Sequence, residues 1–265
     1  MDLPTDASQA KFELYFQYHI LKNRPGLLGD VASLLGMLGF NIVQLAAVSE
    51  SRRGFLILTD KEESIEALKT MLSSIEDAEL DALRPPSLRD RLALRHGRFI
   101  ERSDAETRTY RFVRDELGVL VDFLGELLKR PGRQIVGLRG QPRVGKTESI
   151  VAASVYANKR WFFVSSTLLK QTILRNLPPA DFLNDQFVYI IDGAVSCFRG
   201  DEEHQACLEE VLRLDAPIVI EHPDIFVRHS RYNWDLFDYV IELRREPSEE
   251  IRYDEYERQA AAWNE

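Results

Sequence analysis

The stretch QIVGLRGQPRVGKT, residues 134–147, decides the fold class of this chain. It opens with a continuous apolar run at residues 134–138, which is typical of a strand buried on both faces. A glycine-rich turn follows, and residues 147–158 are compatible with a helix. A buried strand that leads through glycines into a helix predicts an α/β domain built on a parallel sheet.

The turn has the complete pattern G-x-x-x-x-G-K-[ST]. In this pattern the glycines let backbone N–H groups close around a phosphate, the lysine reaches the β- and γ-phosphates, and the threonine hydroxyl joins the Mg²⁺ shell. The N-terminus of the following helix directs its positive end at the same anion. A glycine turn that binds nothing is the alternative. The residues expected to hold the nucleotide are Gly140, Gln141, Pro142, Arg143, Val144, Gly145, Lys146, Thr147 and Glu148.

Further apolar runs recur after this motif, with helical or loop material between them. Continuous apolar runs that alternate with helices predict a parallel sheet covered on both faces. The five predicted strands are residues 134–139, 161–165, 187–192, 217–221 and 239–243.

The strand at residues 187–192 ends in a carboxylate, as a Walker B strand does. We therefore predict that Asp192 holds Mg²⁺ together with Thr147. The next residue is Gly193 and not a glutamate, so the carboxylate pair of many ATP-hydrolysing motors is missing. This favours a kinase-like or switch-like site.

Phosphoryl transfer needs positive charge on the transferred group and a residue that positions the acceptor. Arg228 and Arg231 lie between the last two predicted strands, where a kinase lid places its arginines; surface charges are the alternative. Glu221 ends a predicted strand on the ligand-binding side of the sheet. It is a candidate base, or else it caps the turn that follows. With Lys146 and Asp192, these residues complete the catalytic candidates.

Residues 133–246 resemble the P-loop NTPases and, within them, the small-molecule and nucleoside monophosphate kinases. The resemblance rests on GQPRVGKT, on VSSTLL at residues 164–169, and on IDG at residues 191–193 followed by Arg199. It implies ATP and Mg²⁺ as cofactors and an acceptor pocket lined by Ser165, Ser166 and Arg199. Only about 25 residues separate Thr167 from Asp192, too few for the acceptor-binding domain that nucleotide kinases insert there.

The N-terminal region, residues 11–83, shows a different pattern. Apolar and polar residues alternate strictly from residue 11 to residue 20, which predicts a half-buried strand. A turn, a helix ended by Gly39, two strand-like runs, a shorter helix and a last strand follow. The order β-α-β-β-α-β predicts a ferredoxin-like domain.

These residues resemble an ACT domain, the small-ligand regulatory module of amino-acid metabolism. The most telling stretches are NRPGLLGD at residues 23–30 and GFNI at residues 39–42. The resemblance implies that an amino acid binds at the first strand-to-helix loop, often across a subunit interface. A dimerisation module without ligand is the alternative, and we expect a homo-oligomer, such as a dimer, under either interpretation. The ligand contacts implied by the resemblance are Asn23, Gly26, Leu27, Leu28, Gly29 and Asn41.

The remaining segments complete the predicted organisation. Residues 84–132 are a charged linker followed by a helix that ends at Pro131-Gly132. Residues 1–10 are an N-terminal tail, and residues 247–265 are an acidic C-terminal tail. The full prediction is therefore an ACT-like regulatory domain at residues 11–83 and a P-loop NTPase domain at residues 133–246.

Composition restricts the partners. The chain of 265 residues has a formal net charge of −9, which disfavours a nucleic-acid or anionic-membrane surface because such surfaces need clustered Lys and Arg. No apolar stretch approaches the roughly 18 to 20 residues needed to span a bilayer. The first residues show neither a basic nor an apolar signal region, so we expect a cytoplasmic protein.

The combination of an ACT domain with a C-terminal P-loop resembles, over the whole chain, an uncharacterised family from spore-forming Gram-positive bacteria. The leading hypothesis is a kinase-like ATP- and Mg²⁺-binding protein tuned by a small molecule at the ACT domain. The alternative is a nucleotide-binding regulator with negligible turnover that signals to a protein partner. The residues specify neither the acceptor nor the ACT ligand, and no N-K-x-D run indicates a guanine preference.

Overall fold

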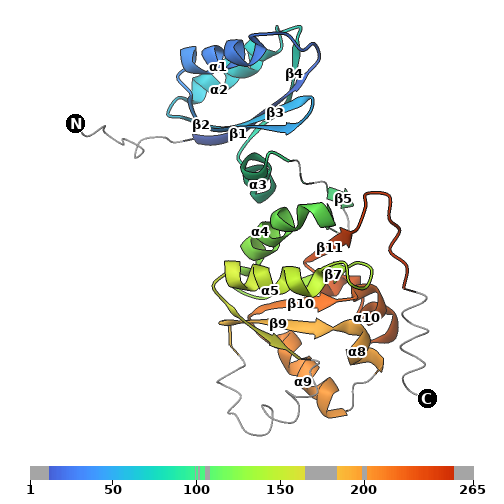
Figure 1. Cartoon of the computed structure of the whole chain (residues 1–265). Helices are drawn as coiled ribbons and strands as arrows, with labels where there is room; N and C mark the ends of the chain where they lie inside the picture. The colour runs from blue at the N-terminus through green and yellow to red at the C-terminus, as the bar shows by residue number, and fades with distance from the viewer. Residues whose placement is uncertain are drawn as a thin grey trace. The chain divides into compact units, whose positions relative to one another are not determined.

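The computed structural model describes residues 12–98, 100, 102–104, 108–164, 184–198 and 202–253, without the side chains of residues 102–104 and 203. The chain divides into two compact units, Met1–Ile100 and Glu101–Glu265 (Figure 1). The first unit carries a four-stranded sheet and the second a seven-stranded sheet.

The first unit has the element order β-α-β-β-α-β that the sequence predicts. The antiparallel sheet has the strand order β2-β3-β1-β4, and α1 and α2 cover one of its faces (Figure 1). Phe16, Phe55, Leu35 and Leu68 are fully buried between sheet and helices. The elements are β1 (Phe12–Ile20), α1 (Leu27–Met37), β2 (Asn41–Ser49), β3 (Arg52–Thr59), α2 (Glu62–Leu72) and β4 (Ala78–Arg84).

A third helix, α3 (Leu88–His96), packs on the opposite face of this sheet. It begins with a capping box, in which the Ser87 side chain accepts from the Asp90 N–H and the Asp90 carboxylate accepts from the Ser87 N–H. Arg84 Nη1 donates to Asp90 Oδ2 at 2.6 Å and so fixes the start of α3 to the end of β4. The buried side chains between α3 and the sheet are Tyr15, Val48, Leu56, Ala93 and Leu94.

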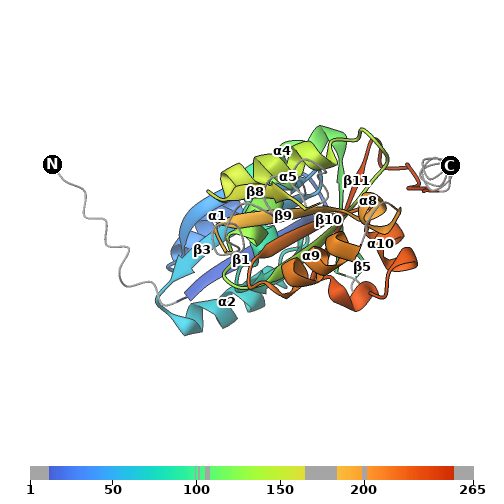
Figure 2. The same ribbon diagram turned by 90° about the horizontal axis from the view of Figure 1, so that it is seen from below.

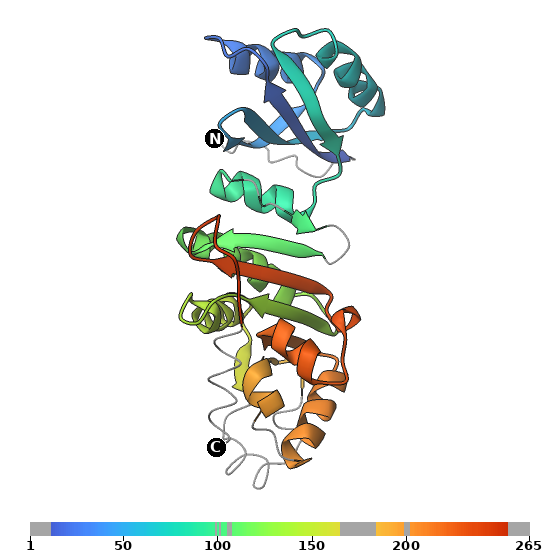
Figure 3. The same ribbon diagram turned by 90° about the vertical axis from the view of Figure 1, so that its right-hand side faces the viewer.

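The second unit is built on a sheet with the strand order β5-β6-β11-β7-β10-β9-β8. All neighbouring strands from β6 to β8 are parallel, and β5 runs antiparallel to β6. Figure 3 shows β11, in red, between the green strands β6 and β7. The strands are β5 (Arg102–Asp104), β6 (Thr109–Val113), β7 (Gln134–Arg139), β8 (Arg160–Phe163), β9 (Phe187–Asp192), β10 (Pro217–Glu221) and β11 (Tyr239–Arg244).

Helices cover both faces of this sheet. On one face α4 (Leu117–Leu128) packs against α5 (Lys146–Tyr156), and α9 (Glu202–Arg213) and α10 (Pro223–His229) lie on the other (Figure 2). The short helix α8 (Gly193–Phe198) contacts α10. Two 3₁₀ turns, η1 (Arg114–Glu116) and η2 (Trp234–Leu236), precede α4 and β11.

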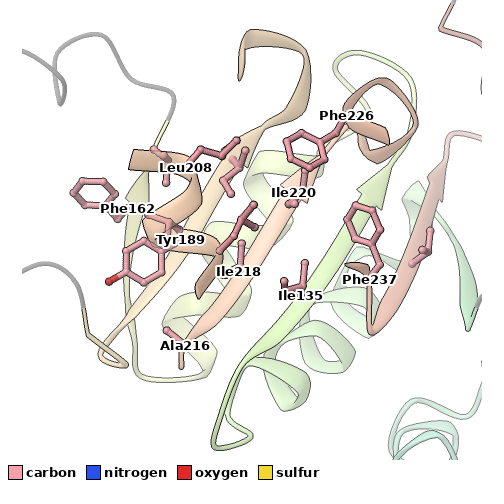
Figure 4. Close-up of a cluster of buried hydrophobic side chains, with 14 residues drawn as sticks. Ile135, Phe162, Tyr189, Leu208, Ala216, Ile218, Ile220, Phe226 and Phe237 are labelled. Carbon is pink, nitrogen blue, oxygen red and sulfur yellow. The ribbon is translucent and has the colours of Figure 1, made fainter. Parts of the chain in front are cut away.

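The central strands carry apolar side chains on both faces of the sheet, because helices cover both faces. Every second residue of β10, Ile218 and Ile220, packs with Tyr189 of β9 and Ile135 of β7 toward α9 and α10 (Figure 4). Phe226 of α10 closes this layer. The apolar core fixes the strand order, and the strand order determines which polar side chains meet at the carboxyl edge of the sheet.

The five strands predicted for this sheet are present as β7 to β11, with boundaries that differ by at most two residues. The interpretation of residues 84–132 as a linker followed by one helix missed α3, β5 and β6. α3 reads LRDRLALRH and is too charged to show a helical apolar stripe, and β5 has only three residues. No helix in the described part of the chain has the length and apolar character needed to cross a membrane.

Gly125 generates the first prediction. A Cβ at this position of α4 would overlap the Tyr156 ring of α5, whereas a Cβ at Gly118 of the same helix would meet no atom within 4 Å. We expect Gly125→Ala to lower the free energy of unfolding by about 1–3 kcal/mol, because the two helices must separate. Gly118→Ala is the control and should change it little, or raise it by up to about 1 kcal/mol. Urea denaturation followed by circular dichroism measures both; equal effects would contradict this account of the α4–α5 contact.

Candidate functional site

The loop between β7 and α5 has a conformation that two glycines make accessible. Gly145, at the N-cap of α5, has φ 108°, in the region that side chains rarely adopt. A Cβ on Gly140 would lie 2.5 Å from the Leu243 carbonyl oxygen of β11, so only glycine fits there. Arg143 has φ 61°, a left-handed conformation in a residue with a full side chain.

The carbonyl groups of residues 140–144 all accept hydrogen bonds from cationic side chains. Lys146 Nζ donates to Gly140 O (2.9 Å) and Gln141 O (3.0 Å). Arg245 Nη2 donates to Pro142 O (3.1 Å). Arg114 Nη1 donates to Arg143 O (3.2 Å) and Val144 O (2.8 Å). In a trans peptide the carbonyl of one residue and the N–H of the next point in opposite directions. The N–H groups of Arg143 and Gly145 therefore point away from these cations, as an anion-binding loop requires.

Lys146 is buried at the first turn of α5, with 5% of its surface exposed. Its ammonium group lies inside the loop and donates to two of the loop's own carbonyl oxygens. Burial lowers the pKa of Lys146, and the neighbouring carboxylates of Glu221 and Asp192 act in the opposite direction. The two hydrogen-bond acceptors of this buried cation are thus neutral carbonyl oxygens, and its negatively charged neighbours are the two carboxylates.

Thr147 is bound to a carboxylate. Its Oγ1 donates to Glu221 Oε1 at 2.6 Å. Glu221 is the last residue of β10, the strand directly beside β7, and it lies in register with Leu138 of β7 and Asp192 of β9. Burial raises the pKa of Glu221, as does Asp192, whereas the Thr147 hydrogen bond and Lys146 lower it.

Asp192 ends β9, two strands from β7. Its Oδ1 accepts the backbone N–H groups of Ala194 (2.9 Å) and Val195 (3.0 Å) and so caps the start of α8. Burial raises the pKa of Asp192, although these two hydrogen bonds and Lys146 oppose the shift. Asp192 therefore has a structural role in α8 besides its charge near Lys146.

The glycine after Asp192 is required by packing. A Cβ on Gly193 would lie 2.7 Å from the Glu221 carbonyl oxygen and 2.9 Å from that of His222. An acidic residue directly after Asp192 is thus sterically excluded. The second carboxylate of the site comes from β10 instead, as Glu221.

A buried charge cluster anchors the end of β7 next to the loop. Arg139, the last residue of β7, pairs with Asp224 of α10 (2.8 Å) and with Glu242 of β11 (2.9 Å). Glu242 also accepts from Arg111 of β6 (3.1 Å) and Arg244 (2.8 Å). The cluster links four elements at the point where the loop begins.

A tyrosine from the C-terminal segment contacts the base of the loop. The Gly140 N–H donates to the Tyr253 hydroxyl at 3.1 Å, and the Tyr253 ring meets the His222 ring edge-on, with 5.5 Å between centroids. Burial lowers the pKa of His222 to about 3, with a smaller effect of Lys146, so this imidazole is neutral at physiological pH. Tyr253 is 5% exposed, which makes it a part of the folded second unit rather than of a solvated tail.

The other predicted site residues lie elsewhere or outside the described residues. Arg231 pairs with Glu209 of α9 (2.8 Å) and donates to the Tyr232 hydroxyl, and Arg228 is exposed on the last turn of α10. No contact recorded for Arg231 joins it to the loop of residues 140–147. The predicted acceptor residues Ser165, Ser166 and Arg199 lie outside the described part of the chain.

In the first unit, five of the six predicted ligand contacts lie at the start of α1 or in the loop before it, whereas Asn41 begins β2, after the end of α1. Gly26, its N-cap, has φ 86°, and the loop before it is exposed. Arg24 fixes this loop, because its Nε donates to Asp77 at 2.6 Å and its Nη2 pairs with Asp30 at 2.7 Å. Within the predicted set, the Leu27 side chain is buried and offers only its backbone, whereas Asn23, Leu28, Gly29 and Asn41 are exposed.

Three residues that the sequence analysis did not single out contact the loop: Arg114, Arg245 and Tyr253. Arg114 lies in the segment interpreted as linker and helix, and Tyr253 in the segment interpreted as an acidic tail. The sequence did contain a signal for Tyr253, because Ile251 and Tyr253 interrupt an acidic stretch with apolar side chains. Arg114 carries no such signal, because a single arginine before a helix is common.

Comparisons with known proteins place the chain in a family. A family model described as "Protein of unknown function (DUF3388)" matches residues 80–265. The chain is also 54% identical, over 248 residues, to "Uncharacterized protein YmfK" of Bacillus subtilis (strain 168). The matched region covers 94% of this chain and 92% of that protein. The predicted resemblance to an uncharacterised Gram-positive family is therefore confirmed at the level of the family.

Two buried glutamates of this unit, Glu221 and Glu242, are expected to change the stability of the fold with pH in opposite directions. The folded-state pKa of Glu221 is raised, so the folded protein binds more protons than the unfolded chain, and stability falls as the pH rises through the unfolded value toward the folded one. Glu221→Gln removes this loss. We expect its melting temperature relative to wild type to increase between pH 4 and pH 7.

Glu242→Gln is the matched control. Although burial opposes it, Arg139, Arg111 and Arg244 lower the pKa of Glu242, so its stabilising effect is present above the unfolded pKa and is lost as the pH falls. Its substitution should lower the melting temperature more at pH 7 than at pH 4. Scanning calorimetry across this range measures both, and the same sign for the two variants would refute the charge assignment.

Proposed function

The chain belongs to the DUF3388 family, and we propose that its second unit binds a nucleoside triphosphate with Mg²⁺, ATP in the first instance, at the loop of residues 140–147. The observation that carries this proposal is the set of hydrogen bonds from Lys146, Arg245 and Arg114 to the loop carbonyls. Because Arg245 and Arg114 hold the Pro142 and Val144 carbonyls, the N–H groups of Arg143 and Gly145, on the opposite sides of those peptides, would be directed at a phosphate before the ligand arrives. This is preorganisation for an anion.

Lys146 and Thr147 supply the remaining groups. Phosphate oxygens carry negative charge, so they attract the Lys146 ammonium group more strongly than neutral carbonyl oxygens do. Lys146 would therefore exchange its two carbonyl acceptors for phosphate oxygens when the nucleotide binds. Thr147, in the first turn of α5, offers its hydroxyl oxygen to the metal ion that accompanies the phosphates.

We propose phosphoryl transfer of the kinase-like type as the reaction of this site. The support is that a glutamate directly after Asp192, the usual water-activating neighbour in ATP-hydrolysing motors, is sterically excluded at Gly193. Lys146 would stabilise the transferred charge, and an arginine from Arg199, Arg228 or Arg231 would add to it. Glu221, which accepts the Thr147 hydroxyl, would contribute the carboxylate beside the loop.

A nucleotide-binding regulator with negligible turnover is the second candidate. The same exclusion at Gly193 favours it, because a site without an activated water hydrolyses slowly and holds its nucleotide for longer. ADP formation from Mg-ATP distinguishes the two candidates when it is measured with pooled amino acids, nucleosides, sugars or nucleoside monophosphates. Turnover with one pool identifies a kinase, and binding without turnover in any pool identifies a regulator.

The first unit would regulate the second through a small molecule, which we propose to be an amino acid bound at the β1–α1 loop. The loop is exposed, it is fixed by the ion pairs of Arg24, and it leads into the N-terminus of α1, which favours a carboxylate. The chain that leaves this unit forms β5 and β6 and then reaches Arg114, which holds the carbonyls of the phosphate loop. A change in the conformation of this segment would reach the loop directly.

Self-association is the alternative role of the first unit. β2 is an edge strand, so one side of its backbone lacks a neighbouring strand within the unit. Val43 and Leu45, both on β2, are 52% and 41% exposed. A homo-oligomer formed at this edge would bury them, and light scattering of the purified chain measures its mass.

Lys146→Ala tests nucleotide binding. We expect its Kd for Mg-ATP to rise about 10- to 100-fold, because charge-assisted hydrogen bonds to phosphate are lost. Lys129→Ala is the matched control: it removes the same charge at the far end of α4, where Lys129 pairs with Glu126. Isothermal titration calorimetry with Mg-ATP and Mg-GTP measures the affinities. Wild-type affinity in Lys146→Ala would refute the proposal.

Gly29→Ala tests the ligand site of the first unit. A Cβ at Gly29 or at Gly36, both in α1, would meet no atom within 4 Å, so both alanine variants should fold. We expect an amino acid that raises the melting temperature of wild type to lose this effect in Gly29→Ala, which adds a methyl group at the first turn of α1, and to keep it in Gly36→Ala. Differential scanning fluorimetry with the twenty amino acids measures the shifts. Equal shifts in both variants would place the ligand elsewhere.

A further inference from the structure

We propose that Glu221, rather than Asp192, is the carboxylate that works with Thr147 to hold the Mg²⁺ of the bound nucleotide. This inference rests on the proposed nucleotide function. It reverses the assignment made from the sequence, in which Asp192 ends a strand of the Walker B kind. Four observations on the described residues lead to it.

The first is the strand order. β10 lies between β7, which carries the loop, and β9, which carries Asp192. Neighbouring strands are about 4.8 Å apart, so the backbone of β9 is about 10 Å from that of β7 at this edge. The carboxylate on the strand directly beside the loop is Glu221, in register with Leu138 two residues before Gly140.

The second is the hydrogen bond from Thr147 Oγ1 to Glu221 Oε1, 2.6 Å long. A threonine hydroxyl has one hydrogen and two lone pairs. When the hydrogen is donated to a carboxylate, both lone pairs remain available, and the oxygen becomes a better ligand for a cation. Glu221 thus orients Thr147 for metal binding and adds a negative charge beside it.

The third is the set of partners of Asp192. Its Oδ1 already accepts two backbone N–H groups at the start of α8. These bonds fix the carboxylate toward α8, and their loss would release the first turn of that helix. Asp192 then contributes its charge to the site, while Glu221 provides the contact.

The fourth is the position of Lys146, which donates to the loop carbonyls close enough to Glu221 and Asp192 for both carboxylates to act on its charge. When Lys146 moves to the phosphates, Glu221 loses part of its compensating positive charge. A divalent ion at Thr147 would replace that charge. Mg²⁺ takes hydroxyl, carboxylate, phosphate and water oxygens and is usually held by one or two carboxylates together with substrate phosphates, so these residues fit it.

The test compares the Mg²⁺ dependence of nucleotide affinity in Glu221→Gln and Asp192→Asn. The Kd for the β,γ-imido analogue of ATP is measured by calorimetry with MgCl₂ and with EDTA, and the ratio of the two values is the readout. We expect Mg²⁺ to improve the affinity of wild type about tenfold or more. Glu221→Gln should reduce this ratio to near one, because it weakens binding with MgCl₂ and, by removing a negative charge beside the phosphates, strengthens binding in EDTA. Asp192→Asn should keep most of the ratio.

Thr147→Val and the double variant Thr147→Val/Glu221→Gln complete the experiment. If the two side chains act on one ion, the double variant loses no more Mg²⁺ dependence than either single variant. Mn²⁺ binding in the presence of the analogue, followed by electron paramagnetic resonance, reports the ion directly. Circular dichroism and melting curves establish that each variant is folded.

The outcomes separate this inference from the function on which it rests. If Glu221→Gln keeps the Mg²⁺ ratio, or if Asp192→Asn alone abolishes it, the assignment to Glu221 is overturned while nucleotide binding stands. If folded wild type binds the analogue neither with Mg²⁺ nor with EDTA, the nucleotide proposal fails, and the metal assignment fails with it.

Discussion

The hydrogen bonds between cationic side chains and the carbonyls of residues 140–144 are the interaction on which the rest of the second unit depends. A loop of this kind has to place several N–H groups on one side, and its carbonyls then need partners on the other side. Here those partners are Lys146 from the loop itself, Arg114 from before α4 and Arg245 from after β11. The two arginines are more than 100 residues apart in the chain. The loop conformation is therefore a property of the whole unit, and only a fold that brings β6 and β11 to the same edge as β7 can produce it.

Strand order has a comparable effect on the acidic residues. Because β10 separates β7 from β9, two different strands present carboxylates to the loop, Glu221 from the nearer strand and Asp192 from the farther one. The close approach of Gly193 to the backbone of Glu221 and His222 prevents a tandem acidic pair on β9. The site thus obtains two carboxylates by pairing neighbouring strands in register. Each carboxylate has its own hydrogen-bond partner: Glu221 accepts from Thr147, and Asp192 caps α8.

The sequence was sufficient for the parts of the molecule that local patterns determine. The alternation at residues 11–20 and the continuous apolar runs at residues 134–139 and 187–192 predicted β1, β7 and β9, because burial leaves a direct trace in the residue order. The prediction that β1 is only half-buried was wrong, because α3 covers the face that carries Tyr15. The order of parallel strands leaves no such trace, so the sequence could not show that Glu221 lies nearer to the loop than Asp192. Long-range partners were missed for the same reason. Arg114 and Tyr253 contact the loop through residues about 30 and 113 positions away in the chain.

The electrostatics of the site explain why a nucleotide would need its metal ion here. Burial raises the pKa of both Glu221 and Asp192, so two carboxylates near one lysine are already a costly arrangement at neutral pH. A triphosphate that arrived alone would take Lys146 for its own oxygens and add negative charge beside both carboxylates. A divalent cation next to Thr147 removes this conflict, because it attracts the phosphates and Glu221 together. The same carboxylate whose burial opposes folding at neutral pH would thus make binding selective for the metal-bound form of the nucleotide.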